Sequence, residues 1–172
     1  MLQTEQGRRR PFGLVRQMIE WWALAGGLVL VGVVLVNAYS IIAGATINKP
    51  FSGDYELTEM GTAIAAFCFL PYCQLVGANV SADLFSLLAG KRGVTLTSLI
   101  AAICAVLFAA ILIWRMSAGL QDYREFDEFS SLLQIPIWWA YIPTLVSLVL
   151  LFLAALITMV DAVTVAKHDP VR

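Results

Sequence analysis

Charge is scarce in this sequence, and it contains a single histidine. Of its 172 residues, 13% are charged and 60% are hydrophobic, whereas a soluble domain averages about a quarter charged and half apolar. A soluble fold of this length has no interior large enough for so many apolar side chains. The composition therefore excludes an ordinary soluble domain and predicts one membrane domain covering residues 1–172.

Basic residues are not in excess, since 11 Lys and Arg stand against 12 Asp and Glu. A nucleic-acid-binding face needs a basic surplus, so we expect no nucleic-acid partner. Cysteine is also rare: Cys68, Cys73 and Cys104 lie in apolar stretches and form no CxxC pair. This pattern predicts small hydrophobic packing residues and argues against a disulfide framework, a redox pair or a zinc site.

The sequence also lacks the groups that membrane enzymes and electron carriers use. Its one histidine, His168, lies in the C-terminal tail, so a haem held by axial histidines inside a helical bundle is excluded. No Ser, His and Asp set and no glycine-rich phosphate loop is present. We therefore expect no enzyme activity, no cofactor and no metal site in this chain.

The sequence does contain four long runs without a charged residue. The runs, of 28, 23, 22 and 32 residues, follow Glu20, Glu59, Arg92 and Glu128. About 20 apolar residues in a helix cross the hydrocarbon core of a bilayer. Because proline fits the first turn of a helix, Pro136 and Pro143 place the start of the fourth span near residue 137. We predict an all-α integral membrane fold with four transmembrane helices, at approximately residues 21–47, 60–82, 93–114 and 137–160.

These spans carry two further signals. As a helix, the first run would be about 42 Å long, so we expect it to tilt or to extend into the headgroup region. No ionisable residue lies in any of the four runs, which argues against a self-contained ion or proton carrier. All five tryptophans fall at span ends, as an aromatic belt would: Trp21, Trp22, Trp114, Trp138 and Trp139.

The segments between the spans predict an orientation. Both tails and the loop between residues 83 and 92 hold eight Lys and Arg, whereas the other two loops hold three. Basic residues in short loops accumulate on the cytoplasmic side. We therefore predict that both termini are cytoplasmic, the N-in/C-in topology.

The segment before the first span has helical periodicity of its own. Its apolar residues recur at Phe12, Val15, Ile19 and Trp22. Arg16 and Glu20 form an i,i+4 pair, so we expect an N-terminal interfacial helix, with a solvated tail as the alternative. A signal peptide is disfavoured, because the apolar run exceeds the core of about 7–15 residues in such peptides.

Small residues at helical spacing mark the faces where helices are expected to approach closely. The third span carries Ala101, Ala105 and Ala109, the fourth carries Ala154 and Thr158, and the first carries Ala23 and Gly27. These residues are our candidates for subunit packing. They serve either packing within the chain or contact with a larger membrane partner, and the sequence leaves both open.

Acidic residues gather in the two loops predicted to face outward. The candidates are Asp54, Glu56, Asp122, Asp127 and Glu128. Complementary charge governs encounter and specificity between proteins, so one hypothesis is that these residues dock a soluble partner. The alternative is that they solvate the loops and stabilise helix N-termini, which we favour for Glu59.

Three segments resemble a known family. They are residues 53–59 (GDYELTE), residues 77–84 (GANVSADL) and residues 130–139 (SSLLQIPIWW). Their order and spacing resemble the small membrane subunit, the DctQ-like component, of tripartite ATP-independent periplasmic (TRAP) transporters. The resemblance covers roughly residues 21–160.

The resemblance implies a function for the whole chain. It implies a large permease subunit as partner, which carries the substrate and sodium sites, and a periplasmic binding protein that delivers the solute. The small subunit would enlarge the stationary scaffold of the carrier, among the lipids of a bacterial inner membrane. The competing hypothesis is a four-helix membrane assembly or chaperone protein that transports nothing.

Overall fold

The structure, a computed structural model, describes residues 13–77 and 91–168 of the chain. Most of these residues lie in helices, and segments 48–53 and 126–137 are loops. The helices are α1 (Gly13–Ile47), α2 (Asp54–Val76), α4 (Lys91–Glu125) and α5 (Trp138–His168). All four are long and apolar enough to cross a membrane, which confirms the predicted all-α class and the four membrane-length helices.

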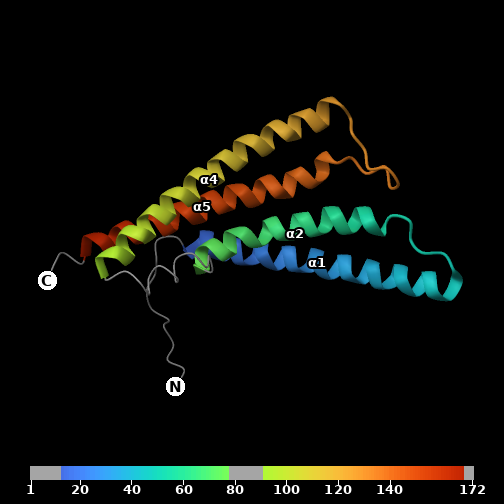
Figure 1. The fold of residues 1–172 in the computed structure, drawn as a ribbon, viewed down its shortest axis with the longest axis horizontal. Helices are drawn as coiled ribbons and strands as arrows, with labels where there is room; N and C mark the ends of the chain where they lie inside the picture. Colours follow the sequence, from blue (N-terminus) through green and yellow to red (C-terminus); the bar gives the residue numbers. More distant parts are fainter. Residues whose placement is uncertain (1–12, 78–90, 169–172) are drawn as a thin grey trace, which may run out of the picture.

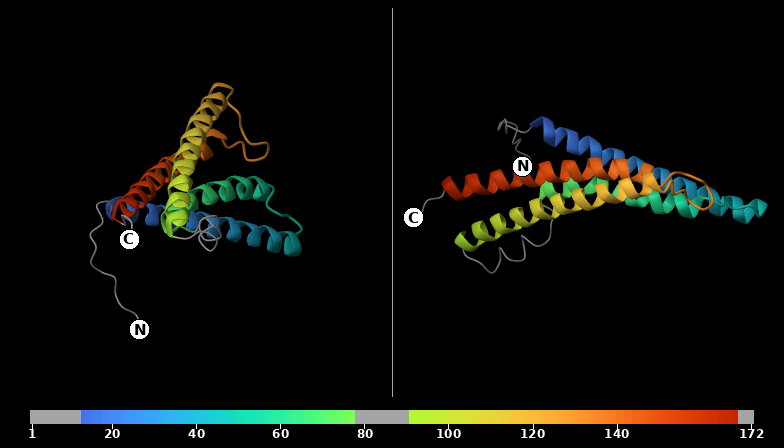
Figure 2. Two further views of the ribbon diagram at one scale, coloured as in Figure 1. Left: turned by 60° about the vertical axis from the view of Figure 1, so that its left-hand side comes forward. Right: turned by 90° about the horizontal axis from the view of Figure 1, so that it is seen from above.

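The helices form an open layer with the neighbour order α1, α2, α5, α4 (Figures 1 and 2). Within the described residues α1 packs on α2, α2 on α5 and α5 on α4, while α1 touches α5 only slightly and does not touch α4. The start of α1 and the end of α5 lie at one end of the layer (Figure 1), here called the terminal end. The loops 48–53 and 126–137 lie at the opposite end, the loop end. Within the described residues the layer therefore has two edge helices, α1 and α4, and each has one main neighbour.

The helix boundaries follow local chemistry as much as hydropathy. Helix α2 ends where Gly77 adopts a left-handed conformation (φ 70°), with its N–H directed at the carbonyls of Cys73 and Gln74. Glycine adopts this conformation without steric cost and is the usual cap. The predicted span continued to residue 82, and residues 78–82 lie outside the described part. Helix α4 runs to Glu125, beyond the predicted end at residue 114. Arg115 ends the apolar run, but a charged residue is compatible with a helix, so the helix continues.

Two clusters of buried side chains lie along α5. One cluster consists of Ile19, Leu150 and Ala154, and the other of Ala109, Leu148 and Leu151. Most other large apolar side chains are exposed on the helix surfaces. The neighbouring helices of the layer leave these surfaces uncovered. In a membrane protein such surfaces meet lipid or a partner.

The segment before the first span is not a separate helix in the described residues. Residues 13–20 form the first turns of α1, and Phe12 lies outside the described part. Val15 and Trp22 pack against the cluster of Ile19, Leu150 and Ala154. Their apolar periodicity thus serves contact with α5.

Candidate functional site

A carboxylate at the start of α2 holds the loop that precedes α5. The side chain of Glu56 accepts hydrogen bonds from the Ser130 hydroxyl (2.7 Å) and from the backbone N–H groups of Leu132 (2.7 Å) and Leu133 (2.9 Å). Ser130 is itself buried, and its N–H donates to the carbonyl of Ile135 (2.9 Å). Glu56 thereby ties two loop-end segments that are more than 70 residues apart in the sequence.

These hydrogen bonds change the acidity of Glu56, which precedes the charge-free stretch beginning at Met60. The Ser130 hydroxyl and the N–H of Leu133 lower the pKa of this carboxyl below its ordinary value of 4.5, and burial opposes the shift. Donors that point at a carboxylate favour its charged form. The charged form of Glu56 is therefore favoured, and this carboxylate organises the loop.

A second acid plays a similar part between α1 and α2. The Ser40 hydroxyl is buried and donates to Asp54 (2.6 Å), while the N–H of Phe51 donates to the same hydroxyl (3.2 Å). Asp54 also accepts a hydrogen bond from the N–H of Tyr55 (2.8 Å). Asp54 thus orders the turn from α1 into α2.

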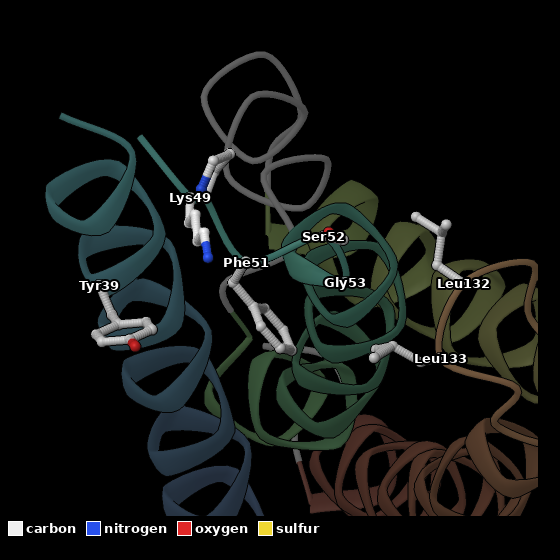
Figure 3. A pocket seen from close by; sticks show the side chains of 8 residues that line it. Tyr39, Lys49, Phe51, Ser52, Gly53, Leu132 and Leu133 are labelled. Atoms are coloured by element: carbon white, nitrogen blue, oxygen red, sulfur yellow. The ribbon is translucent and has the colours of Figure 1, made fainter. Parts of the chain in front are cut away.

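Between the two loop segments lies an open pocket of about 360 Å³ (Figure 3). Tyr39 and Lys49 border it on the α1 side, and Leu132 and Leu133 border it on the other. Gly53 forms part of the wall, and an added Cβ there would lie 2.5 Å from the side chain of Leu133. Any side chain at this position would have to displace the Leu133 side chain.

The other acidic candidates are placed differently. Asp122 lies in the last turns of α4, and Asp127 and Glu128 lie in the loop after it; all three are exposed. The structure therefore separates the five predicted docking residues into two groups. Asp54 and Glu56 organise the loop end from within, and the other three present charge on the surface of that end.

The small-residue candidates also fall into groups. Ala109 and Ala154 are fully buried in the two helix clusters, and Ala105 is half-buried. Ala101 is exposed, and its neighbour Ala102 is buried instead. The contact face of α4 is thus rotated by one residue at this end relative to the predicted ridge.

Thr158 takes part in a polar contact between helices. Its hydroxyl accepts a hydrogen bond from the Gln74 side chain (3.2 Å) and donates to the Ala155 carbonyl (2.9 Å). A second polar contact joins α1 and α5, where the Trp22 indole N–H donates to the Ser147 hydroxyl (2.8 Å). Trp22 was predicted to lie in an aromatic belt, but its N–H points to a buried hydroxyl.

Two glycines outside the predicted small-residue positions, Gly26 and Gly61, form close contacts between α1 and α2. A Cβ on Gly26 would lie 2.5 Å from the Cβ of Cys68, and one on Gly61 would collide with the Val33 side chain. Gly27, which the sequence predicted to be a packing residue, faces open space. Adjacent glycines look alike in sequence, so only the rotation of α1 about its axis distinguishes them.

The described residues offer no ready site for a metal ion. Nowhere among them do three or more His, Cys, Asp or Glu side chains converge. Their arrangement supplies loop organisation and helix contacts, and it points to an interaction role.

Comparison with protein families identifies a matching family. The model of the family described as tripartite ATP-independent periplasmic transporters, DctQ component, matches residues 33–165. This match covers the last part of α1 (residues 33–47), all of α2 and α4, and nearly all of α5. The chain belongs to the DctQ family. Searches of curated proteins and of solved structures each returned no match.

Membership in the DctQ family confirms the resemblance read from residues 53–59, 77–84 and 130–139. It identifies the chain as a TRAP transporter component. The DctQ family is a family of transporter components and not a family of enzymes. Together with the four apolar helices, it indicates a multi-pass membrane protein.

Proposed function

We propose that this chain is the small permease subunit of a sodium-coupled, binding-protein-dependent TRAP secondary transporter. It scaffolds the large permease subunit, which carries the substrate and sodium sites, and so helps to import a small organic solute across a bacterial inner membrane. The observation that carries this proposal is the DctQ-family match over residues 33–165.

The open layer supports a scaffolding role. Edge helices α1 and α4 each leave much of their apolar surface exposed, including Leu28 and Leu35 on α1 and Leu107 and Ile111 on α4. A closed four-helix bundle would bury more of these side chains within itself. An elevator-type carrier needs stationary elements against which a mobile part shifts, and a wide layer adds such surface.

The proposal also includes the orientation of the chain in the membrane and its contact with the binding protein. Eight basic residues on the terminal side against three on the loop side support cytoplasmic termini and a periplasmic loop end. The exposed acids Asp122, Asp127 and Glu128 then face the compartment of the binding protein. We propose that these three contribute to its docking.

Co-purification and uptake test the proposal together. The tagged full chain is co-expressed with the large TRAP permease subunit encoded in the same genome, and the complex is reconstituted in liposomes. The solute is identified by mass spectrometry of the partner binding protein. We expect retention of the large subunit and sodium-dependent uptake that requires both chains.

Two results would reject the proposed function. Undiminished uptake by the large subunit without this chain would show that the scaffold role is wrong. Failure to retain the large subunit, together with rescue of unrelated membrane proteins, would favour the four-helix assembly or chaperone protein instead.

A further inference from the structure

The open pocket at the loop end combines a cation with an apolar wall. Tyr39 and Lys49 border it on the α1 side, Leu132 and Leu133 border it on the opposite side, and Phe51 lies between them (Figure 3). Its volume of about 360 Å³ is near the lower limit of ligand pockets, roughly 300–1,000 Å³. The pocket therefore has room for a small group that is polar on one side and apolar on the other.

Hydrogen bonds hold the two walls of this pocket in place. The N–H groups of Leu132 and Leu133 donate to the Glu56 carboxylate (2.7 and 2.9 Å). The N–H of Phe51 donates to the buried Ser40 hydroxyl (3.2 Å). Because the fold already orders both walls, a ligand binds without the entropic cost of ordering them.

Lys49 supplies the positive charge of the pocket. Its side chain is exposed, and within residues 13–77 and 91–168 no carboxylate forms an ion pair with it. Asp54 and Glu56 do not line the pocket, and both accept hydrogen bonds from the chain itself. An ammonium beside the hydroxyl of Tyr39 is suited to an anion that offers several oxygen atoms.

The pocket lies where α1 leaves the apolar part of the membrane. Lys49 is the first charged residue after the first charge-free run, and the end of that run exposes Ile41, Ile42 and Ile47. Tyr39, one turn earlier in the chain, is 65% exposed. Tyrosine prefers the membrane interface, and lysine extends its ammonium toward it. The pocket is therefore placed at the level of the lipid headgroups.

We propose that this pocket binds the headgroup of an anionic phospholipid. The phosphate accepts hydrogen bonds from the Lys49 ammonium and the Tyr39 hydroxyl. The glycerol and the first methylenes of the acyl chains lie along Phe51, Leu132 and Leu133. This inference rests on membrane crossing and on the pocket, and it does not depend on the proposed transport function.

A protein partner matches the charge of this pocket less well. The exposed acids of the loop end, Asp122, Asp127 and Glu128, attract a basic surface. A basic surface would not pair with the Lys49 ammonium. A phospholipid of the adjacent leaflet presents its phosphate at the level of the pocket and carries the opposite charge.

Native mass spectrometry of the purified full chain in detergent tests the proposal. The chain is titrated with phosphatidylglycerol or with phosphatidylcholine of the same acyl chains, and the bound fraction gives the Kd of the first lipid. Lys49→Gln removes the charge, Lys49→Arg keeps it, and Tyr39→Phe removes the hydroxyl. Arg124→Gln is the matched control, because Arg124 is an exposed cation of the same end that lies over Trp138, outside the pocket.

We expect phosphatidylglycerol to bind more tightly than phosphatidylcholine. Lys49→Gln should weaken the binding of phosphatidylglycerol by about fivefold, the effect of one lysine near an anionic surface. Tyr39→Phe should weaken it by about threefold, the effect of one hydrogen bond. Lys49→Arg and Arg124→Gln should bind as the parent does. Thermal unfolding of each variant should match that of the parent, because Lys49 and Tyr39 are exposed.

Three results would overturn the proposal. Equal weakening in Lys49→Gln and Arg124→Gln would indicate a general attraction of charge. Full displacement of the lipid by glycerol 3-phosphate at the same concentration would assign the pocket to a soluble phosphate. Unchanged lipid binding in Lys49→Gln would also reject it, and loss of the large subunit from that variant in co-purification would then assign Lys49 to a protein carboxylate.

Discussion

At the scale of single residues, the loop end depends on carboxylates that act within the chain. Glu56 accepts hydrogen bonds from three donors in one loop segment, and Asp54 accepts a hydrogen bond from the Ser40 hydroxyl. Both were candidates for docking on charge alone. Charge predicts that a residue attracts donors, but it does not say whether those donors belong to a partner or to a distant segment of the same chain.

Replacing Glu56 should release this loop. In Glu56→Gln one amide oxygen remains as acceptor and an NH₂ group faces the donors, so the N–H groups of Leu132 and Leu133 lose partners. We expect hydrogen exchange at these two amides to accelerate by roughly tenfold or more. Glu59→Gln, an exposed acid in the same helix, is the matched control. Unchanged exchange in Glu56→Gln would mean that the loop is held by other contacts.

The same site predicts a dependence on pH. Because folding lowers the pKa of Glu56 below 4.5, its stabilising contribution is complete above that pH and is lost as the pH falls through the lowered value. Amide exchange at Leu132 and Leu133, corrected for intrinsic rates, should therefore rise below pH 4.5. The rise should be absent in Glu56→Gln, and its persistence there would assign it to another group.

At the scale of helices, close approach is decided by which face of each helix turns inward. Gly26 and Gly61 remove side chains where α1 and α2 touch, while Gly27 faces open space. Small residues at interfaces allow helix backbones to approach closely in membranes. The α1–α2 pair is therefore specified by particular glycines.

The adjacent glycines provide a matched test. Gly26→Ala should destabilise the chain by about 1–3 kcal/mol, because its Cβ would overlap Cys68. Gly27→Ala should be neutral or slightly stabilising, because alanine is the better helix former. Thermal unfolding in detergent measures both. Equal effects of the two substitutions would show that α1 is rotated differently from the structure.

The α4–α5 contact has a matched pair as well. Ala109 is fully buried against Leu148 and Leu151, and Ala101 on the same helix is exposed. Ala109→Leu should therefore lower stability by about 1–3 kcal/mol through overpacking, while Ala101→Leu should leave stability unchanged. Should Ala101→Leu instead block retention of the large subunit in co-purification, its face would belong to an interface between subunits.

At the scale of the whole molecule, the open layer leaves its exposed acids at the loop end. Replacing Asp122 and Asp127 by Asn and Glu128 by Gln together should reduce uptake at limiting binding protein, with partial rescue by excess. Raising the ionic strength should weaken uptake by the parental complex, since exposed charges act within about 8 Å at physiological salt. The Glu59→Gln variant is the control for loss of charge. Parental uptake by the triple variant at every binding-protein concentration would exclude docking at this surface.

Much of the architecture could be predicted from the sequence, because it depends on one-dimensional patterns. Four charge-free runs predicted four membrane-length helices, and segments such as residues 130–139 indicated the DctQ family. Hydrophobic length and local motifs need no knowledge of neighbours. The helix ends were predicted less well, since α4 continues through charged residues to Glu125.

Only the tertiary structure decided which residues meet. The neighbour order α1, α2, α5, α4, the choice of Gly26 over Gly27, and the contact of Glu56 with Ser130 all join segments far apart in the chain. Such contacts depend on the rotation of each helix about its axis and on its displacement along that axis. Hydropathy along one helix constrains neither quantity, because in lipid most of the helix surface is apolar whichever face is buried.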